Sequence, residues 1–321
     1  MQWAKSVAVP PPFKTAPTER SPHPARAPET LPAETGARAD RPHAMRDEYD
    51  EAAIRSYFGH DWWVVRRHTL VTRAMTWVLY REVFRLANAS TYIPGDVVEA
   101  GVWMGGSSMI MALALQRASQ NHLQNRTFWL FDTYEGLPPP GKNDDARSRV
   151  IYGALDAYNR NRNGTEKQWN TTDYRRHVAP RLRVNFINAA AGKWNLGPLS
   201  DVQRNMRGVF RDRHDECVRY IKGKVEDTLR TTRLPEKISV LRLDTDWYES
   251  TAAELELLWP RLQPGGLLYV DDYFTWGGAR KAVQEWLAKH GWTQHAKSLT
   301  STKVEPWHIR KEGSFLRDGV R

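Results

Sequence analysis

Apolar residues along the chain follow two alternating patterns. Over 69–86 they return every three or four positions, a spacing that predicts an amphipathic helix. Further on, short apolar runs alternate with more segments of helical spacing. The runs predict strands at 96–100, 128–132, 217–221, 238–244 and 266–271, and the segments between them predict helices at 107–119, 199–209, 250–261 and 278–290.

This alternation of strands and helices is typical of an α/β fold with a doubly wound, mostly parallel sheet. Two weaker apolar runs, 293–299 and 307–315, bring the predicted sheet to seven strands. In such sheets ligands bind at the carboxyl ends of the strands, near the point where the strand order reverses. The candidate functional residues are therefore those that directly follow the predicted strands.

The chain divides into a tail and one domain. Residues 1–45 hold nine of the 19 prolines and otherwise mostly Ala, Thr, Glu and Arg, a composition that predicts a disordered tail. The domain is expected over 46–321, with an N-terminal helical extension at 46–90. A long polar stretch, 141–196, predicts an insertion with a helix near 152–158 and a strand near 183–188.

The chain of 321 residues carries a net charge of +10. Much of the excess lies in 141–196, where 11 Lys and Arg face five Asp and Glu, so we interpret it as a solvated surface and expect no nucleic-acid partner. No run of 18 apolar residues is present, and no membrane span is expected. The only cysteine, Cys217, excludes an intrachain disulfide and fits a cytoplasmic location.

A glycine-rich turn follows the first predicted strand, in the sequence from Glu99 to Ser108. Gly101 and Gly105 allow a sharp turn and a close approach to a ligand, and the next helix, which begins near Ser107, offers free N–H groups. Glu99 would repel a pyrophosphate but suits an ammonium group, such as the α-amino group of S-adenosylmethionine. The turn lacks the G-x-G-x-x-G spacing of dinucleotide-binding folds.

Acidic residues follow three of the other predicted strands. Asp132 comes one strand later than the glycine turn, where a carboxylate commonly accepts ribose hydroxyls, although an Asp there can also cap a helix. Asp244 ends a strand, and Asp271 and Asp272 end the next. Three carboxylates at one sheet edge repel one another unless a charge offsets them, and a hard divalent cation does so. Such a cation also lowers the pKa of a bound hydroxyl.

The phrases around these residues resemble those of the macrocin O-methyltransferase (TylF-like) family. The matching phrases are residues 93–107, 131–138, 197–202, 222–229, 243–251 and 264–273, and the resemblance covers about 65–312. It implies a class I methyltransferase fold with S-adenosylmethionine as methyl donor and Mg²⁺, or another divalent cation, as metal. It also implies a small-molecule acceptor hydroxyl, typically on the sugar of a glycosylated natural product, and often a homo-oligomer.

Carried over by position, the resemblance assigns Asp244, Asp271 and Asp272 to the metal and Asp244 to the general base. Glu99 and Gly101 match the motif for the methionine part of the cofactor, and Asp132 matches the ribose ligand. The chain departs from the family at Thr245, where Gly is common, at Trp247, where an aliphatic residue is common, and in the length of 141–196.

Three alternatives stay open from the sequence. They are methylation of a non-sugar acceptor such as a catechol or a peptide, a dinucleotide-dependent oxidoreductase, and a binding protein that has kept the fold without the activity. The absence of a G-x-S-x-G turn weakens a hydrolase hypothesis.

Overall fold

The computed structural model describes residues 51–87, 92–118, 126–153, 195–293 and 307–311. All of them belong to one compact unit, Tyr49–Arg321. The predicted disordered tail at 1–45 lies outside the described residues. So do most of the predicted insertion and the weak apolar run at 294–299, and those predictions stay untested.

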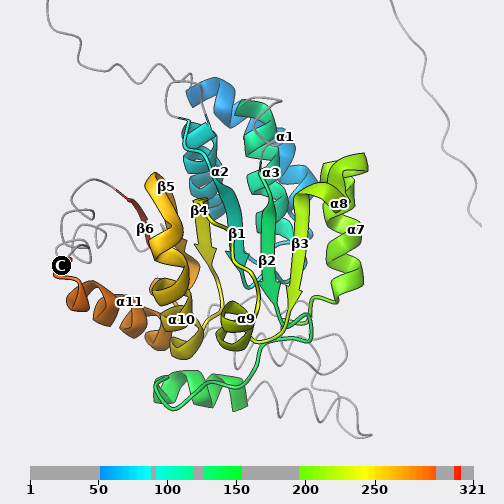
Figure 1. Cartoon of the computed structure of the whole chain (residues 1–321). Helices are drawn as coiled ribbons and strands as arrows, with labels where there is room; N and C mark the ends of the chain where they lie inside the picture. The colour runs from blue at the N-terminus through cyan, green and yellow to red at the C-terminus, as the bar shows by residue number, and fades with distance from the viewer. Residues whose placement is uncertain (1–50, 88–91, 119–125, 154–194, 294–306, 312–321) are drawn as a thin grey trace, which may run out of the picture. The chain divides into compact units, whose positions relative to one another are not determined.

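The described residues form one six-stranded sheet in the order β3-β2-β1-β4-β5-β6. The five strands β1 to β5 pair in parallel, and β6 runs antiparallel to β5 (Figure 1). The predicted mostly parallel, doubly wound sheet is therefore confirmed. The strands are β1 (Asp96–Ala100), β2 (Phe128–Asp132), β3 (Val218–Lys222), β4 (Ile238–Leu243), β5 (Leu262–Val270) and β6 (Trp307–Arg310).

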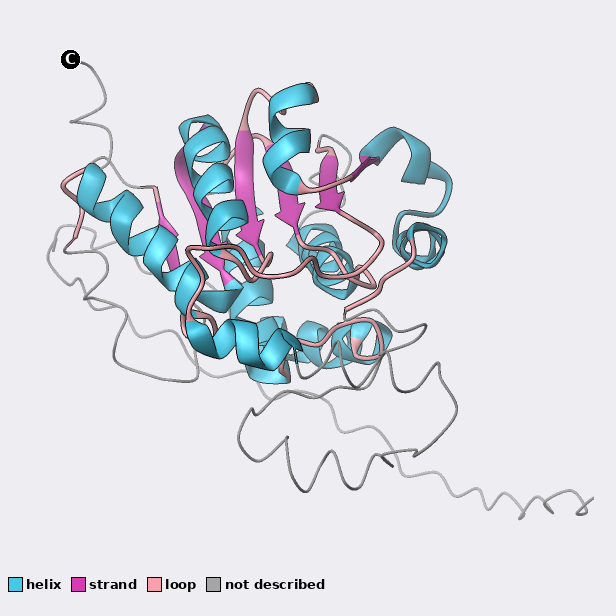
Figure 2. Ribbon diagram, turned by 90° about the horizontal axis from the view of Figure 1, so that it is seen from below, coloured by secondary structure: helices cyan, strands magenta, loops and turns pink. Residues whose placement is uncertain are grey.

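Helices cover both faces of the sheet (Figures 1 and 2). Successive strand residues point to opposite faces, so Val97 and Val240 join one apolar cluster, and Val98 and Leu241 join another. The first cluster holds residues of α1 (Glu51–Val65), α2 (Arg73–Ala87), α3 (Gly106–Ala118) and α7 (Leu199–Phe210). The second holds residues of α9 (Val225–Thr231), α10 (Tyr248–Leu258) and α11 (Gly277–Lys289).

Most predicted elements form within one or two residues of their expected bounds. Two elements differ more: α2 begins at Arg73 instead of Thr69, and β5 begins at Leu262 instead of Gly266 and includes the Pro264–Gly266 turn sequence. A register shift against β4 between Ile238 and Val240 accommodates these extra residues. Cys217 lies in the short helix α8 (His214–Cys217) before β3, not in the strand as predicted.

Short 3-10 segments extend several ends. They are η2 (Arg211–Arg213), η3 (Trp259–Arg261) after α10 and η4 (Asp271–Tyr273) after β5. As predicted, Gly291 ends α11. It has a φ of 72°, its N–H donates to Ala288 O, and Trp292 N–H donates to Leu287 O. In the predicted insertion, residues 146–153 are helical. No helix in the described residues is long and apolar enough to cross a membrane.

Candidate active site

A pocket of about 460 Å³ opens at the carboxyl ends of the parallel strands. It lies where the order reverses, because β1 leads to α3 on one face and its neighbour β4 leads to α10 on the other. The glycine turn after β1 and the ends of β2, β4 and β5 all contribute lining residues. The strand-end rule thus located the pocket from the sequence.

Gly101 holds the end of β1 against the end of β4. Its φ of 82° is in the left-handed region, and a Cβ atom there would overlap the backbone carbonyl of Asp244. The N–H of Asp244 donates to Ala100 O at 2.8 Å. The turn after β1 and the end of β4 therefore pack backbone to backbone, which brings the glycine motif beside Asp244.

Asp132 lies at the end of β2 and lines the pocket. Its Oδ2 accepts the backbone N–H groups of Val102 at 2.7 Å and Trp103 at 3.0 Å, and its Oδ1 accepts that of Tyr134 at 2.7 Å. Burial raises the pKa of Asp132, while these hydrogen bonds act in the opposite direction. The carboxylate therefore fixes the glycine turn. Trp103, in that turn, has a φ of 47°, which is strained for a bulky residue.

Only some of the other predicted cofactor residues line the pocket. Gly101 and Ser107 line the pocket, but Glu99 and Gly105 are not among the described residues that do so. Glu99 is fully buried, with Oε1 bonded to Arg242 and Oε2 to Ser108. A direct contact between Glu99 and a cofactor ammonium would require one of these partners to give way.

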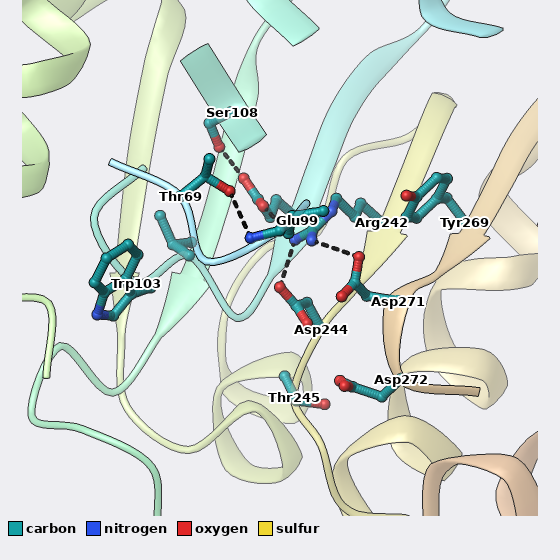
Figure 3. A network of polar contacts seen from close by, with 12 residues as sticks. Thr69, Glu99, Trp103, Ser108, Arg242, Asp244, Thr245, Tyr269, Asp271 and Asp272 are labelled. Carbon is teal, nitrogen blue, oxygen red and sulfur yellow. Dashed lines mark hydrogen bonds and ion pairs between the residues drawn. The ribbon is translucent and has the colours of Figure 1, made fainter. Parts of the chain in front are cut away.

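Asp244, Asp271 and Asp272 lie together, each with a carboxylate oxygen within 4.8 Å of the others (Figure 3). Burial raises the pKa of Asp271 and raises that of Asp272 well above its usual value. Repulsion from neighbouring carboxylates is the second cause of both shifts. The same causes raise the pKa of Asp246, whose backbone N–H donates to Asp272 Oδ2 at 3.2 Å.

Sequence reasoning missed one member of the cluster, Arg242. Its guanidinium is 1% exposed and contacts Glu99, Asp244 and Asp271. The expectation that only a metal offsets the acidic charge was therefore incomplete, since Arg242 offsets one unit of it. The signal was present in the sequence, because Arg242 is a charged residue between the apolar residues Leu241 and Leu243 of a predicted strand.

The three clustered aspartates, Asp244, Asp271 and Asp272, fit a divalent cation. Three clustered aspartates share the single guanidinium of Arg242, which leaves an excess of acidic charge at the cluster. Oxygen ligands clustered at this separation suit a hard ion such as Mg²⁺. Asp244, Asp271 and Asp272 would hold it.

A second wall of the pocket comes from the α1–α2 connection, which the sequence did not link to it, and from the segment 138–149, which includes the start of the predicted insertion. Part of it is the α1–α2 connection, where His68 O accepts the N–H of Gly106 at 2.8 Å and so ties this connection to the start of α3. The segment 138–149 forms another part, because the Trp247 indole donates to Pro138 O at 2.8 Å. The wall residues are His68–Thr72, Met75, Leu137, Pro138, Arg147, Trp247 and Phe274–Trp276.

Asp144 anchors that second segment. Its side chain is buried and accepts the N–H of Tyr248, the first residue of α10, at 3.0 Å. Sequence analysis gives no such role to Asp144, since the two residues are far apart in the chain. Tyr248 itself is not among the described residues that line the pocket, and its hydroxyl donates to Glu285 Oε2 at 2.6 Å.

Comparison with known proteins gives the same family as the sequence phrases. The model of the family described as "Macrocin-O-methyltransferase (TylF)" matches residues 18–155 and 196–306. The demethyldecarbamoylnovobiocin O-methyltransferase of Streptomyces niveus is 32% identical over 197 residues, which are 61% of this chain and 60% of that protein. An 8-demethyl-8-(2,3-dimethoxy-alpha-L-rhamnosyl)-tetracenomycin-C 4'-O-methyltransferase of Streptomyces olivaceus is 30% identical over 214 residues, 66% of this chain and 65% of that one.

The matches thus span less than two thirds of the length of these relatives. Among solved structures, that of the O-methyltransferase NovP superposes with a TM-score of 0.52 at 26% identity, covering 76% of this chain and 82% of that one. The fold is therefore that of a known methyltransferase. Because the family model matches well over half of the residues, the chain belongs to the macrocin-O-methyltransferase (TylF) family.

Proposed function

We propose that the protein transfers a methyl group from S-adenosylmethionine to a hydroxyl oxygen of a small molecule, with a divalent metal held by Asp244, Asp271 and Asp272. The acceptor we propose is a sugar of a glycosylated natural product. One observation carries the proposal. A single pocket joins the glycine turn and Asp132 to the three clustered aspartates.

The glycine turn supplies the cofactor half of the site. Gly106 and Ser107 begin α3 at the pocket wall, and the free N–H groups of a helix start suit the carboxylate of a methionine moiety. Asp132 lies one strand away, and its carboxylate is the group that we propose for the ribose hydroxyls. Gly101 lets the turn pack against the backbone of Asp244, which brings the cofactor half of the site beside the end of β4.

The aspartate cluster supplies the acceptor half. A metal bound there lowers the pKa of a coordinated hydroxyl. Asp244 is partly exposed, and we assign it the proton that the acceptor hydroxyl loses. The acceptor oxygen forms a bond to the methyl carbon as the carbon–sulfur bond breaks, and S-adenosylhomocysteine leaves. The residues of the chain mainly orient the two reactants and stabilise charge.

The sugar acceptor rests on the relatives. The Streptomyces olivaceus protein is named for a rhamnosyl-bearing compound, and the Streptomyces niveus protein for demethyldecarbamoylnovobiocin. We extend this substrate class to the present chain. A cytoplasmic location, a homo-oligomer with contacts over 46–90 and the absence of nucleic-acid and membrane partners remain predictions from the sequence.

Two measurements test the proposal. Thermal-shift titration should show that S-adenosylhomocysteine stabilises the protein and that NADH does not. A methyl-transfer assay over glycosides and catechols, read by mass spectrometry, should then show a gain of one methylene on a glycoside. Stabilisation by NADH alone would favour the oxidoreductase alternative, and binding of neither cofactor would favour a protein without catalytic activity.

A further inference from the structure

Arg242 is a buried cation at the centre of the sheet. It lies on β4, whose six residues are all buried, and its register neighbours are Glu99 on β1 and Tyr269 on β5. Asp244 follows the end of β4 two residues after Arg242, and Asp271 follows the end of β5 two residues after Tyr269. Since side chains alternate along a strand, this spacing favours the same side of the sheet. The topology therefore brings one guanidinium under two of the three clustered aspartates.

The fork of the guanidinium joins three strand ends. Nη1 lies 2.7 Å from Glu99 Oε1 and 2.8 Å from Asp244 Oδ2, and Nη2 lies 3.0 Å from Asp271 Oδ1 (Figure 3). The contacts to Asp244 and Asp271 each use one carboxylate oxygen, so the second oxygen of each is left for another ligand. Asp272 forms no ion pair with Arg242, and its Oδ2 accepts the backbone N–H of Asp246 instead.

Glu99 holds the guanidinium of Arg242 in place. Both of its oxygens are occupied, one by Arg242 and the other by the Ser108 hydroxyl, and the side chain is fully buried. Tyr269 adds its ring 5.8 Å from the guanidinium carbon. A buried charge fixed from several sides in this way has a single geometry, which it imposes on its partly buried partners Asp244 and Asp271.

We propose that Arg242 is a positioning residue that fixes Asp244 and Asp271 side by side, with one oxygen of each left for the divalent ion. It also offsets one of the acidic charges of Glu99 and the three aspartates, which leaves an acidic excess for the divalent ion. This inference rests on the metal site of the proposed function. In this role Arg242 acts through Asp244 and Asp271 and touches neither the substrate nor the ion.

Substitution of Arg242 by Lys tests the fork itself, because Lys keeps the charge but loses the planar pair of donors. Binding of Mn²⁺, followed by electron paramagnetic resonance, should weaken by about 10- to 100-fold in Arg242→Lys, as for other residues that orient metal ligands. Binding of S-adenosylhomocysteine, followed by calorimetry, should change far less. Arg310→Lys is the matched control, since Arg310 pairs with Glu82 outside the pocket lining.

The outcomes separate the inference from the proposed function. If wild type and Arg242→Lys bind Mn²⁺ equally well, or if Arg242→Lys loses Mn²⁺ and S-adenosylhomocysteine binding to the same degree, the positioning role is wrong. If the wild-type protein binds no Mn²⁺, the metal site of the proposed function is wrong and this inference falls with it.

A second comparison does not depend on the folding of the Arg242 variant. In excess EDTA, both Asp271→Asn and Asp272→Asn relieve repulsion between carboxylates, but only Asp271→Asn loses an ion pair with Arg242. Asp271→Asn should therefore melt at a lower temperature than Asp272→Asn. Equal melting temperatures, or the reverse order, would overturn the inference.

Discussion

At the level of single residues, the pocket depends on the missing side chain of Gly101. A methyl group there would overlap the Asp244 carbonyl and also meet an unfavourable φ of 82°. We expect Gly101→Ala to lower the free energy of unfolding by more than about 1 kcal/mol and to weaken binding of S-adenosylhomocysteine, as measured by urea unfolding and calorimetry. Gly208→Ala is the control, because Gly208 lies inside α7 with open space around it and should gain up to about 1 kcal/mol. Equal effects of the two substitutions would contradict the close packing of the two strand ends.

Glu254 gives a pH dependence whose sign can be stated. Burial raises its pKa from 4.5 to about 8, and Oε2 has no hydrogen-bond partner among the described residues, while Oε1 accepts from Thr245. A carboxyl with a raised pKa in the folded state stabilises the fold below pH 4.5 and loses that contribution as the pH rises toward 8. Glu254→Gln removes this loss, so its melting temperature relative to wild type should increase between pH 5 and pH 8. A constant difference across that range would show that Glu254 titrates normally.

Single residues also show where sequence reasoning ends. Asp132, Asp244, Asp271 and Asp272 were found because the ends of parallel strands meet at one edge of the sheet. Arg242 was missed because a strand pattern gives the alternation of side chains but not the partner that each buried charge contacts across the sheet. Which acids Arg242 contacts depends on the register of β1, β4 and β5, and register is a tertiary property.

At the level of elements, the start of α10 depends on a residue from a distant segment. The N-cap residue Trp247 makes no side-chain capping bond, and Asp144 accepts the Tyr248 N–H instead. We expect Asp144→Ala to cost about 1–2 kcal/mol of stability, the range for loss of a helix cap, in urea unfolding. Asp144→Asn keeps an acceptor oxygen and should recover most of that loss. If the two variants lose the same amount, the cap is not what Asp144 contributes.

Some element boundaries depend on local sequence and others on contacts between distant segments. The end of α11 was predicted because Gly291 and its hydrogen bonds are local. The start of β5 was not, because Pro264–Gly266 has the composition of a turn and becomes part of the strand only through its pairing with β4. The α1–α2 connection was not assigned to the pocket, because its contact with Gly106 joins segments that the sequence does not relate.

At the scale of the whole molecule, the alternation of apolar runs was enough to predict the sheet, its mostly parallel order and the edge that holds the pocket. The second wall needed the structure. If the two halves of the pocket bind as proposed, ligands should stabilise the fold by mass action. Mg²⁺ at about 100 times its Kd should add about 2.7 kcal/mol to wild type, and Asp271→Asn should lose this gain in thermal unfolding. An equal gain in Asp271→Asn would locate the ion elsewhere.

The most direct test of the account is methyl transfer itself, measured by mass spectrometry with purified protein, S-adenosylmethionine and a glycoside acceptor. Wild type with Mg²⁺ should add one methyl group, and either excess EDTA or the substitution Asp271→Asn should abolish the reaction while circular dichroism shows an intact fold. Full activity of Asp271→Asn in excess EDTA would contradict the claim that Asp244, Asp271 and Asp272 hold a metal that activates the acceptor hydroxyl.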